Sequence, residues 1–128
     1  MSPAITRVQV KPERKKIPYQ YVFDKIISTT AQTKDNIKIV TSHDFVVTHI
    51  IGNSTELFTV QIQDSVSNKN WFESNINSTN LLGTAQLPNA LPKNKFVRAG
   101  ATITFFLYGS TNNANTIQLV LSGYEMPL

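Results

Sequence analysis

The residues in this sequence best suited to chemistry are two histidines and an aspartate in the stretch SHDFVVTHI. His43, Asp44 and His49 are of the types that bind transition metals or relay protons. On a strand, however, His43 and His49 have the parity opposite to Asp44, so the three side chains do not share one face. A metal site stays an alternative, but we expect structural histidines, no metal and no cofactor.

Other catalytic patterns are missing from the sequence. It has no cysteine, which excludes a thiolate nucleophile and a disulfide framework. No GxSxG nucleophile elbow marks a hydrolase, and no glycine-rich phosphate loop precedes a helix. The eight Asp and Glu residues mostly fall near expected strand ends or turns, which does not suggest the paired carboxylates of a glycosidase. We therefore expect a protein that is not an enzyme.

A basic segment, VQVKPERKKIPYQ, lies near the start of the 128-residue chain. The net charge of +4 is located entirely in residues 1–17, because bases and acids balance from residue 18 onward. Residues 1–17 contain one acid, Glu13, and five bases, Arg7, Lys11, Arg14, Lys15 and Lys16. Three prolines, at positions 3, 12 and 18, exclude a continuous helix. Residues 1–17 are therefore expected to form an extended basic arm.

Three roles for this arm can be compared: docking on another protein, binding nucleic acid, or remaining a solvated tail. A few cations give only weak, salt-sensitive affinity for phosphates, and a neutral body offers no second basic face with interleaved aromatic residues. The prolines exclude an amphipathic membrane helix, and no apolar run is long enough to span a bilayer. We favour protein docking, place nucleic acid second, and expect no membrane association.

Alternating apolar and polar residues predict an all-β body at residues 18–128. The stretches YQYVFDKII, NIKIVT, DFVVTHIIG, ELFTVQIQD, ATITFFLYG and TIQLVLSGYE each indicate a strand. The turn GSTNNAN predicts that the last two strands form an antiparallel hairpin, and STTAQTKDN could form a turn of helix. About seven or eight short strands predict a single antiparallel β-sandwich, jelly-roll-like, with an extended N-terminal arm.

The middle of the chain is less regular. Between Ser65 and Arg98 we expect a short strand near Trp71, followed by a long connection pinned by leucines. Trp71 and Phe72 are adjacent, so one should face inward and the other outward. The exposed ring would contact a partner, whereas the inward ring would seal the sandwich. Asn-Ser-Thr triplets at Asn53 and Asn77 match a glycosylation pattern that chance also explains.

Several segments resemble those of small β-sandwich structural proteins of tailed bacteriophages. The matching segments are IPYQYVFD, SHDFVVTHIIG, FTVQIQDSVSNKNWFE and LLGTAQLPNALPKNKFVRAGATITFFLYGSTNNANTIQLVLSGYE. Together they run from about residue 17 to residue 125, nearly the whole chain. The resemblance implies a virion component encoded among head genes, such as a capsid-associated, decoration or minor head protein, that binds its own kind or the capsid.

On this basis we expect a non-enzymatic virion protein, assembled in the host cytoplasm, that binds the major capsid or neck protein and forms a homo-oligomer. The expected partner-binding residues are Arg7, Lys11, Arg14, Lys15, Lys16, Trp71 and Phe72. Two alternatives come from other classes of protein. One is a carbohydrate- or receptor-binding module in which Trp71 and Tyr108 stack on sugars. The other is a nucleic-acid-binding accessory protein that uses the arm.

Overall fold

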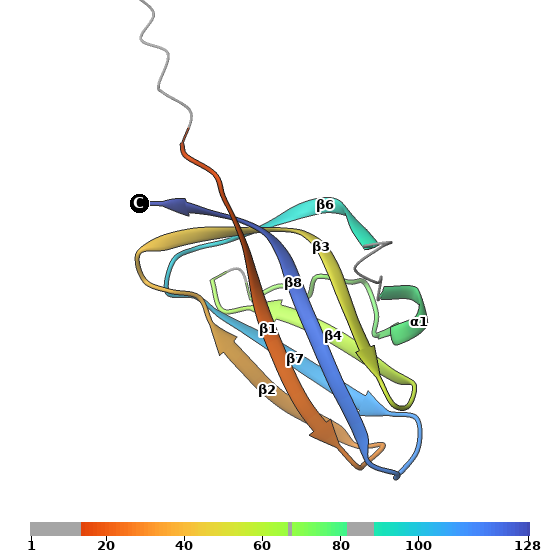
Figure 1. Cartoon of the computed structure of the whole chain (residues 1–128). Coiled ribbons are helices and arrows are strands. Elements are labelled where there is room, and N and C mark those ends of the chain that lie inside the picture. The colour runs from red at the N-terminus through yellow and green to blue at the C-terminus, as the bar shows by residue number, and fades with distance from the viewer. Residues whose placement is uncertain (1–13, 67, 82–88) are drawn as a thin grey trace, which may run out of the picture.

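Two four-stranded antiparallel sheets make up the protein, as the computed structural model shows (Figure 1). The structure describes residues 14–66, 68–81 and 89–128. In spatial order, sheet A consists of β1 (Ile17–Ile27), β8 (Asn115–Pro127), β3 (His43–Ser54) and β6 (Asn89–Val97). Sheet B consists of β2 (Gln32–Lys38), β7 (Thr102–Gly109), β4 (Phe58–Asp64) and β5 (Ile76–Asn77). A turn of helix, α1 (Ser78–Leu81), follows β5 directly.

The core lies between the two sheets and follows from the alternation of the strands. In β7, Ile103, Phe105 and Leu107 are buried, while the residues between them are half-buried on the outer face. Phe23 of β1 stacks on Phe105 of β7 with ring centroids 4.2 Å apart, so this pair joins sheet A to sheet B. The prediction of an all-β protein with two antiparallel sheets packed as a sandwich is confirmed.

The predicted hairpin between the last two strands is wrong. β7 pairs with β2 and β4 in sheet B, whereas β8 pairs with β1 and β3 in sheet A. The turn between them crosses from one sheet to the other, and backbone contacts at its start hold it there. The N–H of Gly109 donates to the carbonyl of Thr29 at 3.1 Å, and the N–H of Ser110 donates to the carbonyl of Leu57 at 3.3 Å.

Two segments differ from their predicted conformations. The turn of helix considered for residues 28–36 is wrong, because β2 begins at Gln32 and pairs with β7 along its whole length. The region expected as a long connection contains β5, α1 and β6, and Asn70 forms an isolated bridge with Gln63 near the expected strand at Trp71. Residues 82–88 of that region lie outside the described residues.

The start of β1 and the end of β8 lie side by side at one end of the sandwich (Figure 1). Ile17, the last residue of the predicted arm, already pairs with Glu125. Nearby, β3 shifts its register between Val47 and His49 against both neighbours, and Gly123 faces this irregularity. A Cβ atom at position 123 would overlap the Val46 carbonyl, so the close approach of β8 to β3 requires glycine.

Candidate functional site

The basic residues of the predicted arm divide into two groups. Arg7 and Lys11 lie outside the described residues. Arg14, Lys15 and Lys16 are exposed and precede β1 directly, at the end of sheet A where β8 ends. We call this end of the sandwich the arm end. The side-chain contacts at the arm end show which of the described bases already bind another part of the same chain.

Arg14 is bound to the body of its own chain. Its Nη1 donates to Oδ2 of Asp44 at 2.8 Å, and its Nη2 donates to the carbonyls of Met126 and Pro127, each at 2.9 Å. These three contacts, which we call the Arg14 clasp, tie the chain before β1 to β3 and to the end of β8. They hold the chain just before β1 against this end of the sandwich. A partner contact through Arg14 stays a prediction, and it would have to share or replace the clasp.

Asp44 is the acidic half of the clasp, and its environment keeps it ionised. Burial of this carboxylate by itself raises its pKa. The N–H of Ala99, which donates to Oδ1 at 2.9 Å, and the neighbouring Arg14 and Arg98 outweigh burial, so the pKa of Asp44 is lowered. Sequence reasoning considered Asp44 only beside the histidines. Nothing in the local pattern indicates its partner, because Arg14 is thirty residues away.

The histidines do not converge on a metal site within the described part of the chain. His43 Nδ1 lies 2.7 Å from the Ser42 hydroxyl and 3.8 Å from a carboxylate oxygen of buried Glu125. His49 Nδ1 instead lies 2.8 Å from the hydroxyl of its neighbour Thr48. Both histidines are half-buried, and each ring lies beside the hydroxyl group of a neighbouring residue.

Glu125 also interacts with Tyr21, whose hydroxyl donates to Oε1 at 3.5 Å and accepts from the N–H of Val40 at 3.2 Å. Burial raises the pKa of Tyr21 and the Glu125 carboxylate adds to this effect, while the Val40 N–H opposes it. Tyr21 therefore stays neutral and joins β1, β8 and the start of the β2–β3 connection. This cluster can support the arm end, but it lacks an arrangement of nucleophile and base.

Trp71 belongs to the core rather than to an exposed surface. Trp71 is 9% exposed, its backbone N–H donates to the Ile62 carbonyl at 2.8 Å, and its indole Nε1 lies 3.5 Å from Oδ2 of Asp64. Phe72 is half-buried and exchanges hydrogen bonds with the side chain of Gln61. The alternative that an aromatic residue seals the sandwich therefore describes Trp71, and the ring leaves little surface for a partner.

The sugar-stacking alternative paired Trp71 with Tyr108, and the structure separates them. Trp71 packs in the core, whereas Tyr108 alternates with buried Leu107 and lies on the outer face of sheet B. The Tyr108 hydroxyl donates to Oε1 of Gln32 at 2.9 Å. The two rings therefore do not form one stacking platform.

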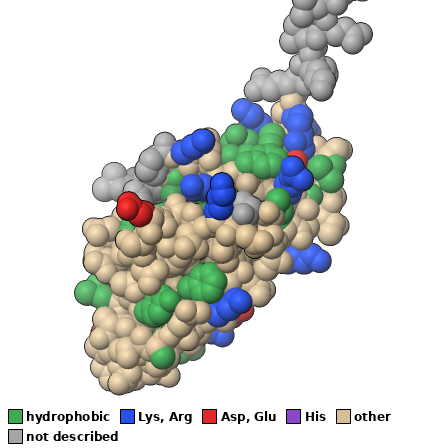
Figure 2. Space-filling view, turned by 180° about the vertical axis from the view of Figure 1, so that it is seen from behind, with side chains coloured by type: hydrophobic (Ala, Val, Ile, Leu, Met, Phe, Trp, Pro, Cys, Tyr) green, Lys and Arg blue, Asp and Glu red, His purple; other side chains and the backbone are tan. Residues whose placement is uncertain are grey.

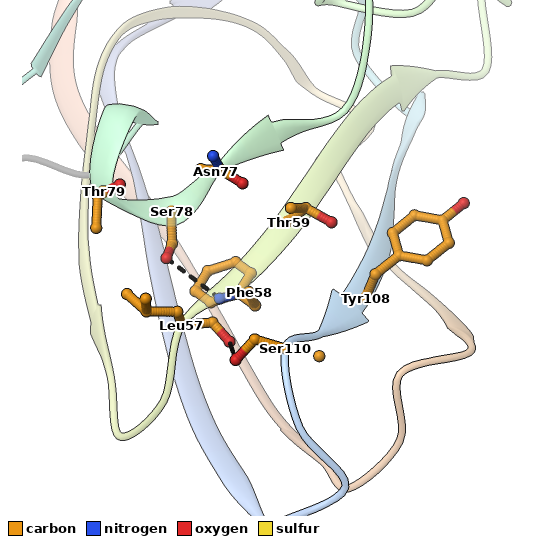
Figure 3. A pocket seen from close by; sticks show the side chains of 9 residues that line it. Leu57, Phe58, Thr59, Asn77, Ser78, Thr79, Tyr108 and Ser110 are labelled. Carbon is orange, nitrogen blue, oxygen red and sulfur yellow. Dashed lines mark hydrogen bonds between the residues drawn. The ribbon is translucent and has the colours of Figure 1, made fainter.

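Tyr108 borders a hollow of about 210 Å³ at the far end of sheet B (Figure 3). The residues that line it are Leu57, Phe58, Thr59, Asn77, Ser78, Thr79, Tyr108, Gly109 and Ser110. Besides that of Tyr108, two of its hydroxyl groups are used internally. Ser78 accepts from the N–H of Phe58 at 3.3 Å, and Ser110 donates to the Leu57 carbonyl at 2.8 Å. None of the lining residues is an Asp, Glu, His, Lys or Arg, and the Tyr108 hydroxyl is bound to Gln32.

Comparisons with known proteins do not assign a function to the chain. No protein-family model, curated protein or solved structure matches the chain. In the described residues, no helix combines the length and apolar character needed to cross a membrane. The strand order, the Arg14 clasp and the distribution of charge are therefore the observations from which function is argued.

Proposed function

We propose that the chain is a non-enzymatic structural subunit of a tailed-phage virion, a capsid-associated or decoration protein with a jelly-roll fold. The strand order is the observation that carries this proposal. Sheet order β1-β8-β3-β6 against β2-β7-β4-β5 places the first strand beside the last and sends most successive strands to opposite sheets. This order supports the two-sheet, eight-strand plan of jelly rolls, which viral capsid domains share with lectins and cupins.

Because a fold alone does not imply a function, the surface and the arm have to supply the rest. Every buried side-chain nitrogen and oxygen of the described residues has a hydrogen-bond partner, as expected of a rigid building block. The Arg14 clasp holds the chain just before β1 against this block. An arm that starts from a fixed point can reach a neighbouring subunit in a defined direction.

The proposed partners are other virion proteins, either the major capsid or the neck protein, together with further copies of this chain. The protein would be assembled into particles in the host cytoplasm. Arg7 and Lys11, which precede the clasp in sequence, are the arm bases we assign to contacts between subunits. Ordering an extended arm costs about 1–2 kcal/mol per residue in backbone entropy, so the partner must offer a substantial surface, acidic where it meets these bases.

Mass spectrometry of purified particles tests virion membership, and absence of the protein from them would overturn the proposal. The role of the arm in docking is tested with a phage from which the gene has been deleted, in infections where full-length variants of the protein are supplied. We expect Arg7→Gln with Lys11→Gln to reduce incorporation into particles. Lys34→Gln with Lys38→Gln, on the outer face of sheet B, removes the same charge and should leave incorporation unchanged. Equal incorporation of both variants would contradict docking through the arm.

A further inference from the structure

An apolar and aromatic row crosses the outer face of sheet A at the arm end. The strand register places Pro18 opposite Tyr124, Tyr124 opposite Val46, and Val46 opposite Phe96. Residues that face each other in antiparallel strands lie on the same face of the sheet, so these four side chains run across all four strands. The next row, which contains Phe45 and Val97, packs in the core. Phe96 is 51% exposed, which leaves its ring accessible.

Positive charge lies on both sides of this row. The ammonium group of Lys16 lies 5.1 Å from the centroid of the Tyr124 ring. Arg98 follows Phe96 by two residues, is exposed, and lies near enough to Asp44 to help lower its pKa. We call Lys16, Phe96, Arg98 and Tyr124 the basic–aromatic patch. Figure 2 shows the side of the molecule away from the patch, where Lys and Arg side chains also lie toward the upper end.

The described acids form no ion pair with the bases on either side of Phe96. No Asp or Glu occurs between Glu73 and Glu125, a stretch that contains Lys93, Lys95 and Arg98. Within residues 14–66, 68–81 and 89–128, no carboxylate forms an ion pair with these three bases. The carboxylates of Asp44 and Glu125 are buried and are occupied by the contacts described above. The net charge of residues 18–128 is therefore zero although their charges are unevenly distributed over the protein.

We propose that the basic–aromatic patch binds single-stranded nucleic acid, with phosphates against Lys16 and Arg98 and an unpaired base stacked on Phe96. Cations supply attraction for the backbone, and an exposed aromatic ring supplies stacking that any base can use. A duplex keeps its bases stacked internally and offers none to Phe96. Lys15, next to Lys16 in the sequence, adds a further exposed base. This activity goes beyond assembly into particles and does not depend on it.

The patch is the second basic face that the sequence analysis did not find in the body. Charge counting by segment could not reveal it, because Lys16 and Arg98 are far apart in the chain and share one face only through the pairing of β1, β8, β3 and β6. A partial signal was present in the acid-free stretch that contains FVRAG. The outer face of sheet B provides a matched comparison, because Lys34 lies 5.7 Å from the Phe106 ring there.

The test is fluorescence anisotropy of a labelled oligothymidine titrated with the full-length protein over a range of salt concentrations. Lys16→Gln with Arg98→Gln is compared with Lys34→Gln with Lys38→Gln, which removes the same charge from exposed positions on sheet B. We expect the patch variant to bind more weakly and its salt slope to fall by about 1.4, since each phosphate contact on a single strand contributes about 0.7. The control variant should retain the slope of the unmodified protein.

Stacking is tested separately with Phe96→Ala and its counterpart Phe106→Ala. We expect Phe96→Ala to weaken binding about fivefold or more, the lower end of the contribution of stacking to one base, and Phe106→Ala to have no effect. Four outcomes would overturn the proposal: no binding at low salt, equal losses in the patch and control variants, duplex bound as tightly as single strand, or no effect of Phe96→Ala. Competition by polyglutamate at equal charge concentration, with the same sensitivity to the variants, would instead assign the patch to an acidic protein partner.

Discussion

Arg14 and Asp44 form an ion pair of 2.8 Å that closes the arm end of the sandwich. The two side chains differ in their surroundings, since that of Arg14 is 42% exposed and that of Asp44 only 10%. Because Arg14 stays largely in solvent, its charge carries little desolvation cost, while the aspartate depends on its partners to remain charged in a buried position. This asymmetry leads to the first two predictions.

Arg14→Gln should lower the free energy of unfolding by about 1–2 kcal/mol. The variant loses a charge-assisted hydrogen bond to a buried carboxylate and two contacts to carbonyls, a loss moderated by the exposure of Arg14. Urea denaturation measures the change. Lys15→Gln removes the same charge from the adjacent exposed position and should change stability by less than about 0.5 kcal/mol. Equal effects of the two substitutions would show that the clasp does not stabilise the fold.

Asp44 should make the stability of the protein sensitive to acid. Its pKa in the folded state is below the ordinary value of 3.8, so the unfolded chain binds the proton more tightly than the folded one. The stabilisation is fully present above pH 3.8 and is lost as the pH falls below it toward the folded-state pKa. Unfolding free energies at several pH values should therefore show that the difference between wild type and Asp44→Asn shrinks in acid. A difference that stays constant with pH would contradict this prediction.

Substitution of either of two glycines by alanine should destabilise the protein, for a different reason at each position. Gly123→Ala drives a methyl group into the Val46 carbonyl, and such overpacking against backbone costs about 1–3 kcal/mol or more. Gly100 has φ +77 and only an ordinary contact, 3.5 Å from a Thr41 methyl group, so Gly100→Ala should cost about 1–2 kcal/mol through the left-handed backbone alone. Thermal denaturation ranks the two variants. A milder effect at position 123 would mean that β8 can shift away from β3.

Trp71→Ala should act on stability rather than on a binding surface. Removing a buried ring of this size costs about 3–5 kcal/mol, and denaturation of the variant measures the loss. Trp71 is the only tryptophan, so its fluorescence reports its environment without interference from another indole. Iodide should quench it weakly in the folded protein and strongly in urea. Strong quenching of the folded protein would show that Trp71 is exposed and accessible to a partner.

Strands with clear apolar alternation could be predicted from the sequence, as in YQYVFDKII and ELFTVQIQD. β2 was missed in part because it lies at the edge of sheet B and carries mostly polar side chains, with Ile37 as its single large apolar residue. The partners of β7 and β8 could not be predicted, because turn residues indicate a reversal of the chain but not the sheet in which it continues. The Arg14 clasp and the basic–aromatic patch share this limit, since both arise from pairings between distant strands.

The turn between β7 and β8 lies at the end of the sandwich opposite Arg14 (Figure 1). Residues 110–114 are exposed there, and the start of the turn is held to the neighbouring connections through Thr29 and Leu57. A subunit attached through its basic end would direct this turn outward from whatever it is attached to. A peptide inserted between Thr111 and Asn113 would then be displayed to the surroundings. The two ends of the molecule would thus have different uses, one for attachment and the other for display.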